Sequence, residues 1–337
     1  MTVNWLENFR RLASAAALAV LFALPLAQAR ADDISDVEQS FDRAFGTELR
    51  APRSYATPFE AQIASLANAS QGRIGVAAVD LNTGKAIDVL GSQPFPMAST
   101  SKIAIAATFL EGVEKGRWTL TSEFPLLIPV RSERFSSTRA PVRNGEYLPA
   151  IELIELMLTR SSNPATDALL AVVGGPPAVN NWVRRAGIKD FRIDRDIATL
   201  VRDDGEVDPA TTIDQRDSAT PLAMAQLLAG LHRGDWLNDY SRSVILEAMA
   251  RCITGKRRIP ALLPESAQVA HKTGSLNNTS SDVGIIKTPD GRAMAIAIYV
   301  TGQGGKRNRE ARIAEIARAL YDGYLSSPQR YGFSASR

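Results

Sequence analysis

Short apolar runs bounded by turn residues occur near both ends of the chain, whereas the middle of the chain repeats its apolar residues every three or four positions. The first pattern is typical of β-strands and the second of amphipathic helices. Residues 73–81 and 85–90 flank the turn sequence Asn-Thr-Gly at 82–84, which predicts a β-hairpin. Three more strands are expected at 268–275, 280–288 and 292–302, with a turn at 287–293 between the last two.

Helical periodicity dominates from about residue 99 to residue 252. A further helix is expected before the first strand, with Thr57 as its N-cap and Pro58 at its first position. A final amphipathic helix is expected at 309–327. The helices of the middle region are expected at 101–116, 148–161, 163–175, 176–187 and 220–234.

Strands at both ends with helices between them predict an α/β fold of the α+β type. The simplest packing is a mostly antiparallel sheet built from both chain ends, flanked by the terminal helices, with an inserted all-helical lobe. A cleft between two such lobes is a common place for an active site. The expected parts are a signal peptide at 1–31, a linker at 32–57, a catalytic domain at 58–326 and a tail at 327–337. Within the domain, the α/β lobe is expected at about 58–98 and 222–326, and the helical lobe at about 99–221.

The N-terminal segment resembles a secretory signal. Arg10 and Arg11 precede an apolar run from Leu12 to Leu26, and Ala29 and Ala31 form the small-residue end of such signals. An uncleaved membrane anchor is the alternative. Removal of residues 1–31 takes away three Arg and one Glu, which leaves a nearly neutral chain. The isoelectric point of about 9.0 is therefore no argument for nucleic-acid binding.

Cysteine and histidine are too scarce for common metal or disulfide chemistry. The single cysteine, Cys252, excludes an intramolecular disulfide and lies in a helical apolar pattern that favours packing over nucleophilic attack. His232 and His271 alone cannot form a multi-histidine metal site. We expect His271 to pack beside its strand, and the sequence indicates no metal and no organic cofactor.

The first candidate motif is Ser99-Thr100-Ser101-Lys102, which precedes an apolar run. On a helix, Ser99 and Lys102 share one face. A serine hydroxyl needs a base to become nucleophilic, and a desolvated lysine near other cations can accept its proton. Chance spacing is the alternative.

The second candidate motif is Ser161-Ser162-Asn163 between two predicted helices. Ser161 could pass a proton to a leaving amine, and Asn163 could bind a lysine or a substrate carbonyl. An ordinary helix cap before Pro164 explains the same residues.

The third candidate motif is Lys272-Thr273-Gly274-Ser275 on a predicted strand. Gly274 inside a strand indicates close approach of another backbone or a ligand. The lysine and the hydroxyl groups could then hold a carboxylate, whereas a solvated edge-strand lysine is the alternative.

In this order, Ser-x-x-Lys, Ser-x-Asn and Lys-Thr-Gly resemble the active site of penicillin-recognising serine enzymes. Longer stretches are similar to class A β-lactamases: 73–102 resembles the strand pair and nucleophile segment, and 214–228 resembles the end of the omega loop. Residues 252–275 and 316–325 resemble the approach to the third motif and the last helix. The similarity covers about 58–326.

The resemblance implies a role for each motif residue. Ser99 would be the acylated nucleophile, Lys102 its proton acceptor, and Ser161 the proton donor to the leaving nitrogen. The N–H groups of Ser99 and Ser275 would form the oxyanion hole. Arg195 and Asp217 resemble the ion pair that closes the omega loop. The substrate would be bound by Asn163, Lys272, Thr273 and Gly274.

The sequence departs from the family in the omega loop. The family has a glutamate and an asparagine there that hold the deacylating water, but the corresponding positions are Ile197 and Val201. The loop is also longer and carries several carboxylates, which we interpret as solvated loop charges rather than as a replacement base. These carboxylates are Asp196, Asp203, Asp204, Glu206 and Asp208.

Two further departures are smaller. Ser162 stands where the family usually has an aspartate with a structural role. No clear match exists for the family's arginine that helps bind the substrate carboxylate, since Ser280 and Ser281 lie near one expected place.

Three hypotheses follow for the function. The first is a periplasmic or secreted serine hydrolase of the class A β-lactamase type, which opens β-lactam amides through an acyl-Ser99 intermediate and deacylates slowly. The second is a D-Ala-D-Ala peptidase acting on peptidoglycan, with β-lactams as slow inhibitors. The third is a non-catalytic binder of peptidoglycan or β-lactams. We expect a monomer that does not bind nucleic acid and is not inserted in a membrane after signal cleavage.

Overall fold

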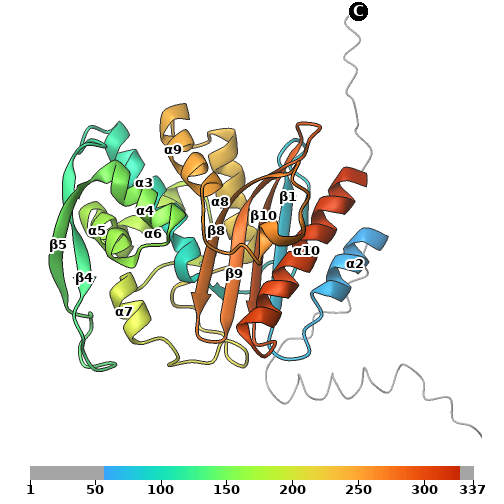
Figure 1. The fold of residues 1–337 in the computed structure, drawn as a ribbon, viewed down its shortest axis with the longest axis horizontal. Coiled ribbons are helices and arrows are strands. Elements are labelled where there is room, and N and C mark those ends of the chain that lie inside the picture. Colours follow the sequence, from blue (N-terminus) through green and yellow to red (C-terminus); the bar gives the residue numbers. More distant parts are fainter. Residues whose placement is uncertain (1–56, 327–337) are drawn as a thin grey trace, which may run out of the picture. The chain divides into compact units, whose positions relative to one another are not determined.

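A five-stranded antiparallel sheet forms the frame of the protein (Figure 1). The computed structural model describes residues 57–326. The strand order β2-β1-β10-β9-β8 places the first strand beside the last, with Ile74 opposite Val300 and Asp80 opposite Met294. The prediction that both chain ends build one sheet is therefore confirmed. The strands are β1 (Ile74–Asp80), β2 (Ala86–Val89), β8 (Gln268–Leu276), β9 (Thr279–Lys287) and β10 (Ala293–Thr301).

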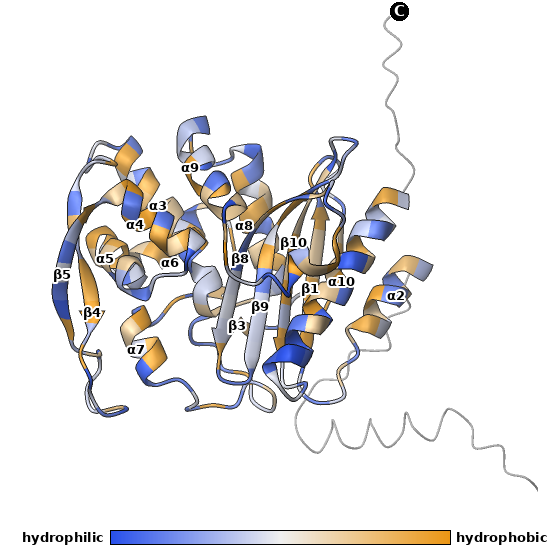
Figure 2. Cartoon of the chain, viewed as in Figure 1, coloured by the Kyte–Doolittle hydropathy of each residue, from blue (hydrophilic) through white to orange (hydrophobic). Residues whose placement is uncertain are grey.

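Helices α2 (Pro58–Leu66) and α10 (Lys306–Ser326) cover one face of this sheet (Figure 1). The side chain of Thr57 caps α2, and Pro58 is its first residue, as predicted. Helix α10 carries hydrophobic and hydrophilic residues (Figure 2), and its buried residues recur at helical spacing. They meet the larger side chains of β10. The buried side chains of this layer include Ile296, Ile298, Ile313, Ile316 and Leu320.

The opposite face of β10 is lined mainly by alanine, because a helix packs closely against it. Ala295 and Ala297 alternate with the isoleucines that face α10. Helix α8 (Pro221–Arg233) lies on this alanine face and also contacts β1. Every residue of β10 is consequently buried, which explains why its sequence is a continuous apolar run.

Helix α3 (Lys102–Glu114) is the centre of the second lobe. Four helices contact it, so most of its residues are buried, and its sequence is apolar on nearly all sides. The 3₁₀ turn η1 (Ala98–Ser101) leads into it. The surrounding helices are α4 (Ala150–Thr159), α5 (Asn163–Val173), α6 (Pro176–Arg185) and α9 (Asp239–Ala250), and α7 (Ile197–Arg202) lies against α5.

The inserted lobe is not purely helical, which corrects the expectation from sequence. Strands β4 (Glu123–Pro129) and β5 (Val142–Pro149) form an antiparallel hairpin that packs on α5 (Figure 1). Pro125 and Pro129 make this segment unsuitable for a helix interior. The hairpin has its own sheet and does not pair with the five-stranded sheet.

A small sheet connects the nucleophile segment with both ends of the loop between Arg195 and Asp217. Strand β7 (Ser218–Ala219) pairs with β3 (Phe95–Pro96) on one side and with β6 (Phe191–Arg192) on the other. The backbone N–H of Met97 also donates to the carbonyl oxygen of Asp217 at 3.0 Å. The loop is thus fixed to the turn that carries Ser99.

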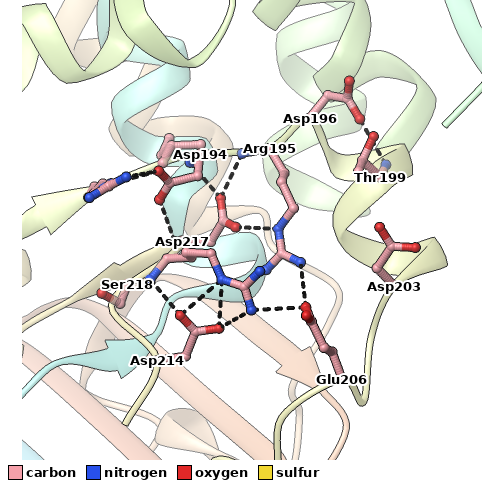
Figure 3. A network of polar contacts seen from close by, with 12 residues as sticks. Asp194, Arg195, Asp196, Thr199, Asp203, Glu206, Asp214, Asp217 and Ser218 are labelled. Carbon is pink, nitrogen blue, oxygen red and sulfur yellow. Dashed lines mark hydrogen bonds and ion pairs between the residues drawn. The ribbon is translucent and has the colours of Figure 1, made fainter. Parts of the chain in front are cut away.

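Figure 3 shows the polar contacts that close this loop. The carboxylate of Asp217 accepts hydrogen bonds from the backbone N–H groups of Asp194 and Arg195, and from Nε of Arg195 at 2.6 Å. The predicted pairing of Arg195 with Asp217 is confirmed.

The other loop carboxylates are not simply solvated, so that interpretation was wrong in part. Asp203 is buried and accepts from Nε of Arg202 at 2.7 Å and from the N–H of Phe135 at 3.1 Å. Asp204 accepts a hydrogen bond from the backbone N–H of Asn277, and Asp208 accepts one from the side-chain amide of Asn278. Both asparagines lie in the β8–β9 turn. The extra loop residues therefore fold back onto neighbouring segments. Of the other two loop carboxylates, Asp196 caps α7 and Glu206 forms an ion pair with Arg216.

The remaining expectations on chain organisation lie outside the described residues. They concern the signal peptide at 1–31, the linker, apart from Thr57, and the tail at 327–337. Within the described part of the chain, no helix is both long enough and apolar enough to cross a bilayer.

The ion pair of Asp217 gives a prediction on stability. Asp217→Ala leaves Arg195 and two backbone N–H groups without their acceptor in a largely buried place, and we expect a loss of about 3 kcal/mol in unfolding free energy. Asp214→Ala, which removes a more exposed partner of Arg216, should cost less than about 1 kcal/mol. Urea denaturation of both variants measures the difference. Equal losses would contradict a special role for the Arg195–Asp217 pair.

Candidate active site

Ser99 lies at the N-terminal side of α3, in the turn η1. The backbone of Ala98 has a left-handed φ of 48°, which is strained for a non-glycine residue. The N–H and the hydroxyl of Thr100 both donate hydrogen bonds to the carbonyl oxygen of Met97. The hydroxyl of Ser101 donates one to the carbonyl oxygen of Ala98. These bonds hold the turn so that Ser99 is half-buried beside the start of the helix.

Lys102 is fully buried, and its ammonium group is bound by the second motif. Its Nζ donates to the carbonyl oxygen of Ser161 at 2.8 Å, to the amide oxygen of Asn163 at 2.8 Å and to the hydroxyl of Ser161 at 3.2 Å. Ser161 has a left-handed φ of 58°. The structure thus brings the first and second sequence motifs into direct contact.

Lys272 approaches the same hydroxyl from strand β8. Its Nζ donates to the Oγ of Ser161 at 2.9 Å and to the carbonyl oxygen of Thr273 at 2.9 Å. Ser161 therefore lies between two buried lysines, one from each lobe. This contact joins all three motifs in one site.

Burial lowers the pKa of both lysines. The pKa of Lys102 is well below its ordinary value because of burial and then the positive charge of Lys272, against which Asp167 acts. Burial also lowers the pKa of Lys272 to about 8, although the charges of Cys252 and Asp282 oppose the shift. The predicted desolvation of Lys102 next to another cation is present in the structure.

Gly274 allows β8 to lie against the turn η1. A Cβ atom at this position would lie 2.6 Å from the carbonyl oxygen of Met97 and 2.5 Å from the hydroxyl of Ser281. Only glycine fits there without displacing the backbone of the nucleophile segment. The close approach that a glycine inside this strand indicated is therefore real, and it brings Ser275 next to the same turn.

The structure also reveals a cation that sequence reasoning missed. Arg258 precedes the 3₁₀ turn η2 (Ile259–Leu262) and is buried beneath β8. Its guanidinium donates to the hydroxyl of Ser275 at 2.6 Å, to the carbonyl oxygen of Gly274 at 2.8 Å and to that of Ser281 at 2.7 Å. Nothing in the local pattern of Lys256, Arg257 and Arg258 distinguishes the inward-facing residue, and only the folded chain does.

The omega-loop position without a carboxylate lies at the start of α7. Ile197 is buried, and Val201 is half-exposed. The N–H groups of Ile197 and Ala198 donate to the two carboxylate oxygens of Asp167, at 2.7 and 2.8 Å. A carboxylate is thus present behind α7, but it comes from helix α5 and both of its oxygens bind backbone.

Ser162 and His271 take local structural roles. The hydroxyl of Ser162 caps α5 by accepting from the N–H of Ala165. His271 is buried on β8 beside Asp282, and its Nδ1 lies 2.9 Å from both carboxylate oxygens. The expectation that His271 packs beside the strand therefore extends to an ion pair with the neighbouring strand.

Comparison with known proteins supports this architecture. A family model described as the β-lactamase enzyme family matches residues 58–324. β-Lactamase CTX-M-8 of Citrobacter amalonaticus is 32% identical over 275 residues, which is 80% of this chain and 90% of that protein. The extended-spectrum β-lactamase PER-1 of Pseudomonas aeruginosa is 27% identical over 77% of this chain and 85% of its own length.

Solved structures give the same result. A β-lactamase from Chitinophaga pinensis superimposes with a TM-score of 0.69 at 28% identity and covers 80% of this chain and all of its own. A variant of the last common ancestor of the class A β-lactamases of Gram-negative bacteria reaches a TM-score of 0.67 at 32% identity, over 80% of this chain and 99% of its own. The chain belongs to the class A β-lactamase family and is an enzyme of the serine β-lactamase type.

Proposed function

We propose that the enzyme opens β-lactam amides by acylation of Ser99, with Lys102 as the proton acceptor. The observation that carries the proposal is the Ser161 hydroxyl, bound by two buried lysines whose pKa values are lowered. A lysine with a lowered pKa is unprotonated more often and can then accept a proton from a serine.

In the proposed acylation, Nζ of Lys102 takes the proton of Ser99, and Oγ of Ser99 attacks the β-lactam carbonyl carbon. The backbone N–H groups of Ser99 and Ser275 stabilise the negative oxygen that develops, an effect worth about 3–4 kcal/mol per donor in other enzymes. As the carbon–nitrogen bond breaks, Ser161 gives its proton to the leaving nitrogen and is reprotonated from the lysines. This assignment accounts for a hydroxyl placed between two amines.

The carboxylate of the substrate would bind at the end of β8. Thr273 and Ser275 supply hydroxyl groups, and Lys272 and Arg258 supply positive charge close behind them. Asn163 would contact the substrate amide, and the absence of a side chain at Gly274 leaves room for the ligand. Arg258 fills the role for which the sequence offered no arginine.

Deacylation is expected to be the slow step. A positioned general base is worth about 10²–10⁴ in rate, and the side chains of Ile197 and Val201 cannot act as one. The hydrogen bonds of Asp196, Asp203, Asp204, Glu206 and Asp208 fix the loop or its neighbours, as described above. An acyl enzyme that persists is the consequence.

A peptidoglycan D-Ala-D-Ala peptidase is the second candidate. The observation that favours it is again Ile197, because a peptidase of this fold does not require the omega-loop glutamate. We also propose that the enzyme is exported to the periplasm, because residues 1–31 have the features of a secretory signal. The monomeric state expected from the resemblance stays a prediction.

Intact-mass spectrometry with benzylpenicillin tests acylation and deacylation together. We expect an adduct of one penicillin on the wild-type chain that persists for minutes to hours, and none on Ser99→Ala or on Lys102→Ala within the same time. The mass of the exported protein also shows whether residues 1–31 have been removed.

Rapid loss of penicillin without an adduct would contradict slow deacylation and would show that another base acts. Survival of the penicillin without an adduct would contradict acylation of Ser99. A persistent adduct together with release of D-Ala from a cell-wall peptide would favour the peptidase.

Ile197→Glu should accelerate deacylation. The new carboxylate would stand at the position where the family holds its water-activating base, and we expect the adduct lifetime to fall by about 10²-fold or more. Ile197→Gln is the matched control, because it has the same size without the charge. Equal lifetimes in both variants would show that the missing base does not limit turnover.

Asp167 gives a prediction on pH. Burial raises the pKa of Asp167 to about 6, although the N–H groups of Ile197 and Ala198 oppose the shift. A carboxyl with a raised pKa in the folded state contributes stability that is fully present below about pH 3.8 and is lost as the pH rises through about 6.

Asp167→Asn removes this ionisation. From pH 4 to pH 8 the variant should therefore gain about 2–3 kcal/mol in unfolding free energy relative to the wild type, as measured by urea denaturation at each pH. Asp208→Asn serves as the control: hydrogen bonds lower the pKa of Asp208, so its relative trend should have the opposite sign. The same trend in both variants would contradict the assignment.

A further inference from the structure

A chain of three side chains runs from the end of α9 to the carboxylate-binding strand. Cys252 follows α9 and is half-buried. Its Sγ lies 3.2 Å from Oγ1 of Thr254, which in turn lies 2.7 Å from Oγ1 of Thr273. Thr273 is the residue whose hydroxyl faces the substrate carboxylate in the proposed function. The protonation state of Cys252 can therefore affect Thr273 through two hydrogen bonds.

The thiol of Cys252 also forms a hydrogen bond with His271, which pairs with the buried Asp282. Burial would raise the pKa of Cys252, but the hydrogen bond and the charge of His271 outweigh it, and the net shift is downward. Burial lowers the pKa of His271, yet the charge of Asp282 and its hydrogen bond raise it to about 10. A protonated imidazole beside the thiol makes loss of the thiol proton easier.

Other charged groups around the thiol keep their own partners. Lys272 of β8 binds Ser161, and Arg258 binds the backbone of β8 and β9 and contacts Glu310. Arg251, the sequence neighbour of Cys252, pairs with Glu155 of α4 at the surface. The charged group that forms a hydrogen bond with the Cys252 thiol is thus His271, although the charge of Lys272 is also felt there.

The thiol can donate to Oγ1 or to the carbonyl oxygen of Thr254, whereas a thiolate can only accept. Because each hydroxyl has one proton to donate, the thiolate fixes the direction of both bonds. When the thiol donates to Thr254, Thr254 donates to Thr273, and the proton of Thr273 is free for a ligand. When a thiolate accepts from Thr254, Thr254 must accept from Thr273, and Thr273 has no proton left for a carboxylate.

We propose that Cys252 is a positioning residue that sets the direction of the hydrogen-bond chain through Thr254 and thereby decides whether Thr273 can donate to an anionic substrate group. The inference rests on the proposed carboxylate site but not on the chemistry at Ser99. A β-lactam with a carboxylate is bound more tightly while the thiol keeps its proton. Loss of the thiol proton weakens binding without altering Ser99 or Lys102.

The experiment measures the Kd of benzylpenicillin by calorimetry in the Ser99→Ala background, where no acyl enzyme forms. Three proteins are compared between pH 6.5 and pH 9.5: the Ser99→Ala parent, which keeps Cys252, and the parent with Cys252→Ser or with Thr254→Val added. With Cys252, binding should weaken by about 10-fold more than with Cys252→Ser, because one hydrogen bond to a charged group is lost. The Cys252 charge acts on Lys272, but this charge is the same in the parent protein and in Thr254→Val, so the titration of Lys272 cancels between these two.

Thr254→Val separates the hydrogen-bond chain from simple charge repulsion. The thiolate remains in this variant, but it no longer communicates with Thr273, so the extra alkaline loss should disappear. The inference is wrong if Thr254→Val still shows the extra weakening of penicillin binding at alkaline pH. It is also wrong if all three proteins have the same pH profile of binding, or if none of them binds the penicillin. A merely structural role would instead weaken binding at every pH. Failure of the proposed function is seen separately, as the absence of an adduct when Ser99 is intact.

Discussion

Two buried lysines that share one hydroxyl are the constraint on which the site depends. An ammonium group is rarely buried without partners, because the loss of hydration is large. Lys102 recovers part of that loss through three acceptors, two of which belong to Ser161. The carbonyl of Ser161 reaches the lysine with Ser161 in a left-handed conformation, so backbone strain and lysine burial are linked. The remaining cost appears as a lowered pKa, which is the property that a proton acceptor needs.

The fold supplies this arrangement by bringing three segments far apart in sequence to one place. The alanine face of β10 lets α8 lie close to the sheet, and the glycine at 274 lets β8 lie close to η1. The small sheet of β3, β7 and β6 then fixes the Arg195–Asp217 loop to the same turn. Ordinary packing requirements therefore determine how near Lys272 comes to Ser161. The close approach of β8 to η1 depends on the missing side chain at position 274.

Much of the fold and of the motif set follows from local patterns. The five strands and the capped first helix have clear signals, and Ser99, Lys102 and Lys272 are recognisable because their order and spacing are rare. The hairpin of β4 and β5 was not predicted, since its prolines interrupt a region where helical periodicity prevails. Arg258 was also missed, and Asp203 was expected to be solvated but is buried. Both depend on contacts between segments distant in sequence, and no spacing along the chain encodes them.

The position of Ile197 is best understood together with Asp167. Asp167 holds the first two N–H groups of α7 and is buried near Asp196, whose charge contributes to its raised pKa. A carboxylate at position 197 would add a further negative charge to this enclosed place, at a cost that rises as the surroundings become less polar. An apolar side chain avoids that cost and keeps α7 packed against α5. The same choice removes the group that would activate water, so the stability of the loop and the rate of deacylation depend on one set of contacts.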